Sequence, residues 1–105
     1  MTLREKQSLF AKLVGILICY ATARGWDLTF SDFYRGDLDG HMPGSLHYDR
    51  LAADMNLFVG GRWMQSDCPE WQTLGSVWKS LDPLCAWGGD FGDFNHISLA
   101  DRGRK

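Results

Sequence analysis

Cysteine is scarce in this chain, and its scarcity excludes two classes of small domain. The 105 residues include three cysteines, Cys19, Cys68 and Cys85. Three cysteines always leave one unpaired, so a disulfide framework is not expected. None of them stands in a Cys-x-x-Cys pair, which argues against a cysteine-rich zinc site. The pattern is typical of a protein made in a reducing compartment.

The chain also lacks an excess of positive charge and a long hydrophobic run. Its formal net charge of −2 provides no basic field for nucleic acid. The longest apolar run, residues 13–20, is far too short to span a bilayer. Hydrophobic residues nevertheless make up 45% of the sequence, which is enough for a folded core. We therefore expect one domain over residues 1–105, a monomer that binds no nucleic acid and has no membrane span.

The N-terminal segment allows two interpretations. The apolar run follows several basic residues, as in a signal peptide, but no clean cleavage site comes after it. Thr2 and Glu5 have the spacing of a helix capping box, and Gly25 suits the end of a helix. We favour a packed helix, and hence synthesis in the cytoplasm without a signal peptide. Its apolar stripe has helical spacing: Leu9, Phe10, Leu13, Ile16, Leu17 and Tyr20.

The remaining patterns predict strands and one further helix. Strands are expected at 28–35, 51–59, 62–64 and 97–99, with a hairpin turn at Gly60–Gly61 and a helix over 67–81 that Asp67 caps. Residues 101–105 are expected to form a frayed polar tail. The fold class is thus α+β, a small and mainly antiparallel sheet with an N-terminal helix and a second helix packed on it.

Two segments forty residues apart each provide a histidine and carboxylates. Residues 45–54 contain His47 and Asp54, and residues 87–96 contain Asp90, Asp93 and His96. Imidazole and carboxylate are the usual ligands of a catalytic Zn²⁺, which keeps three protein ligands and one open position. We interpret His47, Asp54 and His96 as the three ligands.

The spacing of the first segment constrains its shape. On one continuous strand, His47 and Asp54 would face opposite sides and lie about 23 Å apart. Two ligands of one ion cannot be so far apart, so the chain must turn at residues 48–50. After the turn, the alternation of 51–59 puts Asp54 on the more polar face of a strand.

Both segments resemble the VanY-like peptidoglycan peptidases, the zinc D-Ala-D-Ala carboxypeptidase and L-alanyl-D-glutamate endopeptidase family. That family carries Ser-x-His-x-x-Gly-x-Ala-x-Asp, then Trp-Gly-Gly-Asp, then Asp-x-x-His. The resemblance covers roughly residues 28–99 and is greatest to short phage-encoded members, although Arg50 replaces a frequent glycine and the 36–44 loop is short. The matching residues are Ser45, His47, Ala52, Asp54, Trp87 to Asp90, Asp93 and His96.

The resemblance implies a fold like that of the Hedgehog and DD-peptidase proteins, and a role for each matched residue. Asp93 would act as the general base, with Asp90 as the alternative. Arg35 would face the substrate, since the family strand ends in Tyr-Arg. The substrate would be a peptidoglycan stem peptide with D-amino acids, cut by an endolysin-like enzyme that acts on the bacterial cell wall after holin-dependent release. The motifs do not choose between endopeptidase and carboxypeptidase.

Two other classes of function remain open from the sequence. One is a non-catalytic module that contains zinc and binds the cell wall. The other is a zinc-stabilised structural domain, such as part of a phage virion, which a fourth protein ligand would favour.

Overall fold

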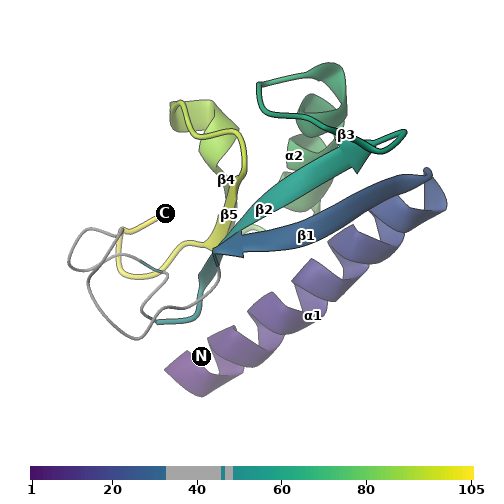
Figure 1. Ribbon diagram of the computed structural model, residues 1–105. Coiled ribbons are helices and arrows are strands. Elements are labelled where there is room, and N and C mark those ends of the chain that lie inside the picture. The colour runs from purple at the N-terminus through teal and green to yellow at the C-terminus, as the bar shows by residue number, and fades with distance from the viewer. Residues whose placement is uncertain (33–45, 47–48) are drawn as a thin grey trace.

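The computed structural model describes residues 1–32, 46 and 49–105, and it joins two helices to one antiparallel sheet (Figure 1). This confirms the α+β class. Along the chain the elements are α1 (Leu3–Ala23), β1 (Trp26–Asp32), β2 (Ala52–Val59), β3 (Arg62–Trp63), α2 (Pro69–Leu81), β4 (Cys85–Trp87), the 3₁₀ helix η1 (Gly88–Phe91) and β5 (His96–Leu99).

Helix α1 begins with the expected capping box. The Glu5 backbone N–H donates to Thr2 Oγ1 at 3.1 Å, and the Thr2 backbone N–H donates to Glu5 Oε1 at 2.8 Å. These two bonds satisfy amides that the first turn leaves without helical partners. The helix ends at Ala23, and Gly25 adopts a φ of 79°, a left-handed conformation that suits glycine. The chain then turns back and runs along α1 as β1 (Figure 1).

The buried face of α1 differs in one place from the expected stripe. Phe10, Leu13 and Leu17 are buried as expected, together with Val14. Ile16 was also expected inside, but it is 45% exposed. The i, i+3 and i+4 spacing fits Ile16 as well as its neighbours, and only the position of the sheet decides which side of the stripe is covered.

The sheet has the strand order β1-β2-β5-β4, with β3 paired to the end of β2, and every pairing is antiparallel. The last strand of the sequence therefore lies inside the sheet, between β2 and β4. The sequence predicted a strand at 97–99, but it predicted neither this central position nor β4, because three residues are too few to show alternation.

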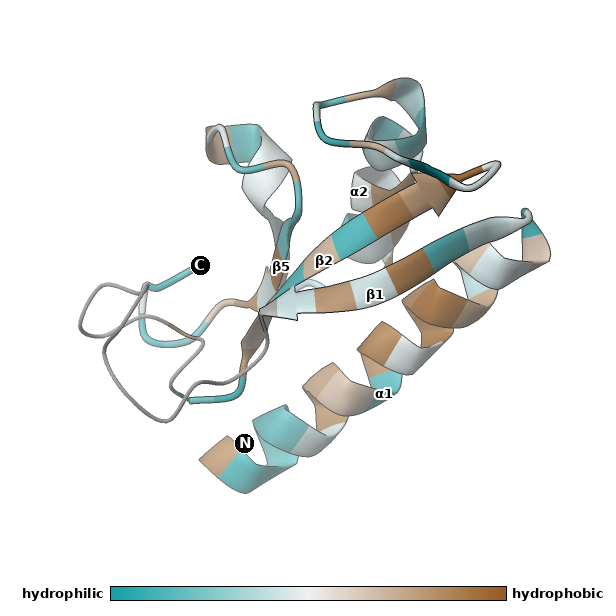
Figure 2. Ribbon diagram, viewed as in Figure 1, coloured by the Kyte–Doolittle hydropathy of each residue, from teal (hydrophilic) through white to brown (hydrophobic). Residues whose placement is uncertain are grey.

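Strand β2 carries the clearest periodic pattern. Leu51, just before the strand, and Ala53, Met55 and Leu57 within it are at most 1% exposed. Asp54 and Asn56, which alternate with them on the other face, are partly exposed. Figure 2 shows the same alternation as teal and brown bands along β2. The turn that follows, Gly60–Gly61, has φ values of 59° and 77°, as two-residue hairpins with positive φ at both positions require. Both predictions are confirmed.

The N-cap of helix α2 is Cys68, one residue after the predicted cap Asp67. The Cys68 side chain makes no capping hydrogen bond. Pro69 occupies the first helical turn. Asp67, expected to be the cap, instead accepts hydrogen bonds from Gln72 Nε2 at 2.9 Å. The indole of the buried Trp78 donates to the Ala86 and Ser98 carbonyls at 3.0 and 3.2 Å. These bonds fix α2 to β4 and β5.

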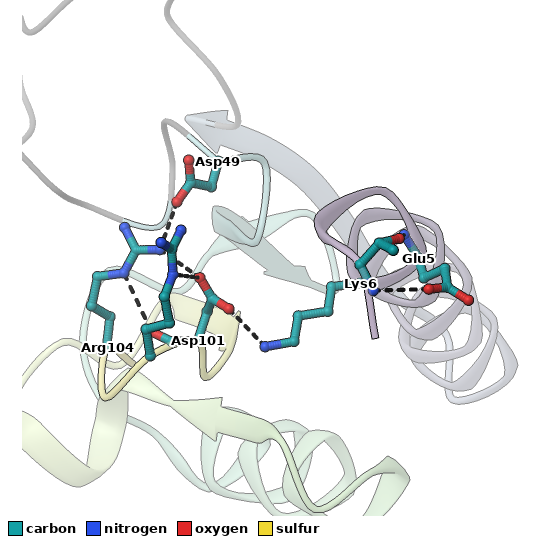
Figure 3. A network of polar contacts seen from close by, with 7 residues as sticks. Glu5, Lys6, Asp49, Asp101 and Arg104 are labelled. Atoms are coloured by element: carbon teal, nitrogen blue, oxygen red, sulfur yellow. Dashed lines mark hydrogen bonds and ion pairs between the residues drawn. The ribbon is translucent and has the colours of Figure 1, made fainter.

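The C-terminal residues are not the frayed tail that their composition predicted. Arg104 Nη2 donates to Asp49 Oδ2 and to Asp101 Oδ2, each at 2.6 Å, and Lys6 Nζ donates to Asp101 Oδ1 at 2.6 Å (Figure 3). Lys6 and Arg104 hold the pKa of the buried Asp101 carboxyl well below its usual range. We call Lys6, Asp49, Asp101 and Arg104 the C-terminal charge cluster.

The length and hydropathy of the described helices decide whether any of them could span a membrane. Over residues 1–32 and 49–105, no helix is both long enough and apolar enough to cross a bilayer.

Candidate metal centre

Asp54 and His96 are brought together by the pairing of β2 with β5. Asp54 is the third residue of β2 and His96 is the first of β5, and the register places them directly opposite each other. Residues directly opposite in an antiparallel pair point to the same face of the sheet. The two side chains accordingly meet, with 3.3 Å between His96 Nδ1 and Asp54 Oδ1.

Asp93 joins them from the loop between η1 and β5. The Asp93 backbone N–H donates to the Gly88 carbonyl at 2.8 Å, and the His96 N–H donates to the Asp93 carbonyl at 3.1 Å. With this loop fixed, one ligand atom each of Asp54, Asp93 and His96 lies within 4.8 Å of the others. The group could hold a metal ion.

One pair of atoms in this group has the spacing of two ligands of a tetrahedral ion. Ligands about 2.0–2.1 Å from such an ion lie about 3.3–3.4 Å from each other. The 3.3 Å between His96 Nδ1 and Asp54 Oδ1 equals this edge. His96 is buried, Asp54 is half-buried and Asp93 is exposed, so the group is open to solvent on the Asp93 side.

Gly88 allows the loop to approach His96 so closely. A Cβ on Gly88 would collide with the Asp93 backbone carbonyl and with the Cβ of His96. The neighbouring Trp87 packs its ring against Gly75 and Gly89, where a Cβ would also collide, and its indole donates to the Phe94 carbonyl at 2.7 Å. The Trp-Gly-Gly sequence thus builds the loop that carries Asp93.

Asp90, the alternative base, lies in a different environment. Its carboxylate pairs with Lys79 Nζ of α2 at 3.0 Å, and both side chains are substantially exposed. Lys79 also lies over the Trp87 ring, 5.6 Å from its centroid. Of the two aspartates near His96, the structure brings Asp93 into the group of possible ligands and pairs Asp90 with a lysine.

Two predicted site residues, the ligand His47 and the substrate-facing Arg35, lie outside the described residues. The predicted turn after His47 is present in its described part. Arg50 has a φ of 57°, and the Leu51 N–H donates to the Leu46 carbonyl at 2.9 Å. The chain therefore turns immediately before it enters β2.

The cysteines contribute nothing to the group of ligands. Burial raises the pKa of the Cys85 thiol to about 12 and also raises that of Cys68. Among the described residues, the group of possible ligands contains no cysteine. Cys19 is exposed on α1.

One residue near the group was not singled out by its sequence pattern. The ring of Phe91 lies edge-on to the His96 imidazole, with 5.8 Å between centroids, and Phe91 is half-exposed. The only signal in the sequence was its position directly after Trp-Gly-Gly-Asp.

The chain matches no protein-family model, and no curated protein matches it. The function proposed below therefore depends on the geometry of the site and on the resemblance of its motifs.

Proposed function

We propose that the protein is a zinc metallopeptidase that hydrolyses peptide bonds in peptidoglycan stem peptides. The single observation that supports this most is the meeting of Asp54, Asp93 and His96, which come from two distant motifs. In the proposal, His47, Asp54 and His96 hold Zn²⁺. A mixed imidazole and carboxylate set suits zinc better than Ca²⁺ or Mg²⁺, which prefer oxygen ligands alone.

Zinc would supply Lewis-acid polarisation of the scissile carbonyl and would lower the pKa of a bound water to about 7. The chain's own residues would do the rest. Asp93 is the exposed member of the group, so its carboxylate can reach the attacking water, take a proton and return it to the leaving amine. The pairing of Asp90 with Lys79 favours Asp93 as the base. Arg35 would steady the carbonyl oxygen or a substrate carboxylate.

The family resemblance supports the remaining parts of the proposal. The substrate would be a peptide that contains D-amino acids, and the protein would act as a monomer on the bacterial cell wall. The resemblance further implies an endolysin-like role, with synthesis in the cytoplasm and holin-dependent release.

Digestion of purified peptidoglycan tests the function directly. Zinc-loaded wild type should release fragments whose masses identify the bond that is cut, and Asp93→Ala should release almost none. Asp90→Ala is the matched control, since it removes a nearby carboxylate outside the group, and it should retain most of the activity. Zinc binding without any release of fragments would instead favour a non-catalytic wall-binding or structural module.

A further inference from the structure

A pocket of about 140 Å³ lies beside the candidate metal centre, between the β2–β3 hairpin and the loop before β5. Asn56 and Asn95 line it, and each is close in sequence to a member of that centre, Asp54 or His96. The Met55 N–H donates to the Asn95 carbonyl at 3.0 Å, which holds the two sides of the pocket together. The chemistry proposed above makes no use of this pocket.

Trp63 forms a flat apolar wall of the pocket. It pairs directly with Phe58 across β3 and β2, and the two rings stack with 6.5 Å between centroids and an interplanar angle of 25°. Although the indole is held in this way, Trp63 is still 49% exposed. The face of an aromatic ring is electron-rich and attracts polarised C–H groups. A sugar ring presents such C–H groups on its apolar side, so this indole is suited to stack on a sugar.

The polar part of the lining consists of side-chain amides from Asn56, Gln65 and Asn95. Over residues 1–32, 46 and 49–105, no group of another residue hydrogen-bonds these three amides. An amide both donates and accepts hydrogen bonds, as the hydroxyl and N-acetyl groups of an amino sugar do. An apolar ligand would leave the amides without partners, which costs free energy. The combination of an aromatic wall and open amides therefore matches a sugar.

The sugar of peptidoglycan can reach the pocket from a scissile bond at the metal centre. Residues two apart on a strand lie on the same face, so Asn56 lies on the Asp54 side of β2, about 7 Å along the strand. In peptidoglycan, the stem peptide begins with L-alanine, which is joined through a lactyl group to an N-acetylated sugar. The lactyl group has the backbone length of one residue, so the bond after L-alanine lies about 7 Å from the sugar in an extended chain. The two spans agree, whereas the bond between two terminal D-alanines is several residues farther from the sugar.

We propose that this pocket is a sugar subsite, which binds the N-acetylated sugar ring joined to the stem peptide through contact with Trp63 and hydrogen bonds to the amides. This assignment rests on the proposed function for the identity of the polymer, and it adds that part of the binding is to the glycan. Asn56 and Trp63 then recognise the glycan and take no part in the chemistry.

Binding of small sugars to zinc-loaded wild type tests the subsite. The probe is the methylamide of N-acetylmuramic acid, in which an amide blocks the lactyl carboxyl as it does in peptidoglycan. The NMR resonance of the Trp63 indole N–H, identified by its loss in Trp63→Phe, should shift and saturate with this probe. Glucose, which lacks the N-acetyl group, should bind about tenfold more weakly, the equivalent of one to two hydrogen bonds. Lactic acid methylamide, which has no sugar ring, should not shift the resonance.

Further variants separate the subsite from general effects on the fold. Asn56→Leu should weaken binding of the probe about three- to tenfold, the equivalent of one hydrogen bond. Trp63→Ala should weaken it at least as much, and there binding is followed by the N-acetyl methyl signal of the probe, because the indole is absent. Ile16→Ala, which removes a similarly exposed apolar side chain on α1, should change nothing.

The results that overturn the subsite are an indole resonance that the probe does not move, glucose that binds as tightly as the probe, or equal binding of the probe by Trp63→Ala and wild type. Release of free D-alanine as the only product of digestion would also overturn it, since the sugar would then lie too far from the metal centre. The two proposals fail separately. Sugar binding by a wild type that releases no fragments from peptidoglycan would refute the peptidase and keep the subsite. Release of fragments by a wild type that does not bind the probe would refute the subsite alone.

Discussion

The metal group, which consists of Asp54, Asp93 and His96, and the C-terminal charge cluster lie around the same two strands, β2 and β5, yet they use their aspartates differently. Asp54 lies on β2 and His96 on β5, while Asp49 comes just before β2 and Asp101 just after β5. In the charge cluster, Lys6 and Arg104 neutralise the carboxylates. In the metal group, two carboxylates and an imidazole gather their ligand atoms within 4.8 Å.

The difference shows how partners decide the role of a carboxylate. A buried carboxylate is stabilised by cations, and Asp101 has two of them at 2.6 Å, which suits a structural ion pair. A group whose ligand atoms lie this close together can hold a metal ion. In the proposal, Asp54 and His96 bind Zn²⁺, so we expect the stability of the metal group to depend on a bound ion and that of the charge cluster to be independent of it.

Of the changes considered, replacement of Asp93 should have the largest effect. It should lower the rate of hydrolysis and leave zinc content unchanged. Asp93→Ala removes the proposed base but none of the three proposed ligands, so peptidoglycan hydrolysis should fall by about 10²–10⁴-fold. Steady-state rates, with zinc content measured on the same samples, check this. Near-wild-type turnover in Asp93→Ala together with a large loss in Asp90→Ala would reverse the assignment of the base.

Chelation should lower stability through the metal group. An ion that binds only the folded state at 100 times its dissociation constant contributes about 2.7 kcal/mol. Thermal melts of zinc-loaded protein with and without chelator should therefore differ clearly. The same comparison in Asp101→Asn should show an equal shift, because the charge cluster shares no residue with the proposed ligands. Coincident curves for wild type would mean that the ion contributes nothing to the fold.

Gly88→Ala should disturb the metal group through packing. The added methyl group collides with the Asp93 carbonyl and the His96 Cβ, so the loop must shift. Overpacking of this kind costs typically about 1–3 kcal/mol. The open position of Gly15 provides the control, since a Cβ there meets nothing within 4 Å. Denaturant unfolding should show destabilisation in Gly88→Ala and not in Gly15→Ala.

Asp101→Asn should lower the stability of the fold without affecting activity or zinc content, and the dependence of this effect on pH identifies its cause. The lowered pKa of Asp101 means that its ion pairs stabilise the fold fully above the unfolded pKa of about 4. This contribution is lost as the pH falls below that value toward the folded pKa. The difference in melting temperature between wild type and Asp101→Asn should therefore be constant from pH 6 to 8 and shrink in acid. A difference that grows in acid would contradict the ion pairs.

The parts of the fold that sequence could predict are those with local causes. The capping box of Thr2 and Glu5, the alternation around Asp54 and the Gly60–Gly61 turn each depend on neighbouring residues. The nearness of Asp93 to His96 follows similarly from their spacing of three, and the structure bears out this nearness.

The parts that failed have causes elsewhere in the chain. Asp101 and Arg104 look like a polar tail until Lys6 and Asp49, from distant segments, are placed beside them. The position of β5 between β2 and β4 is likewise decided by pairing partners rather than by its own four residues.

Zinc stoichiometry tests the central claim most directly. Purified wild type, equilibrated with zinc and desalted, should contain one zinc per chain by mass spectrometry of the metal. His96→Ala and His47→Ala should each lose it, and Asp90→Ala, whose carboxylate pairs with Lys79, should keep it. Equal zinc in wild type and His96→Ala would contradict the metal centre.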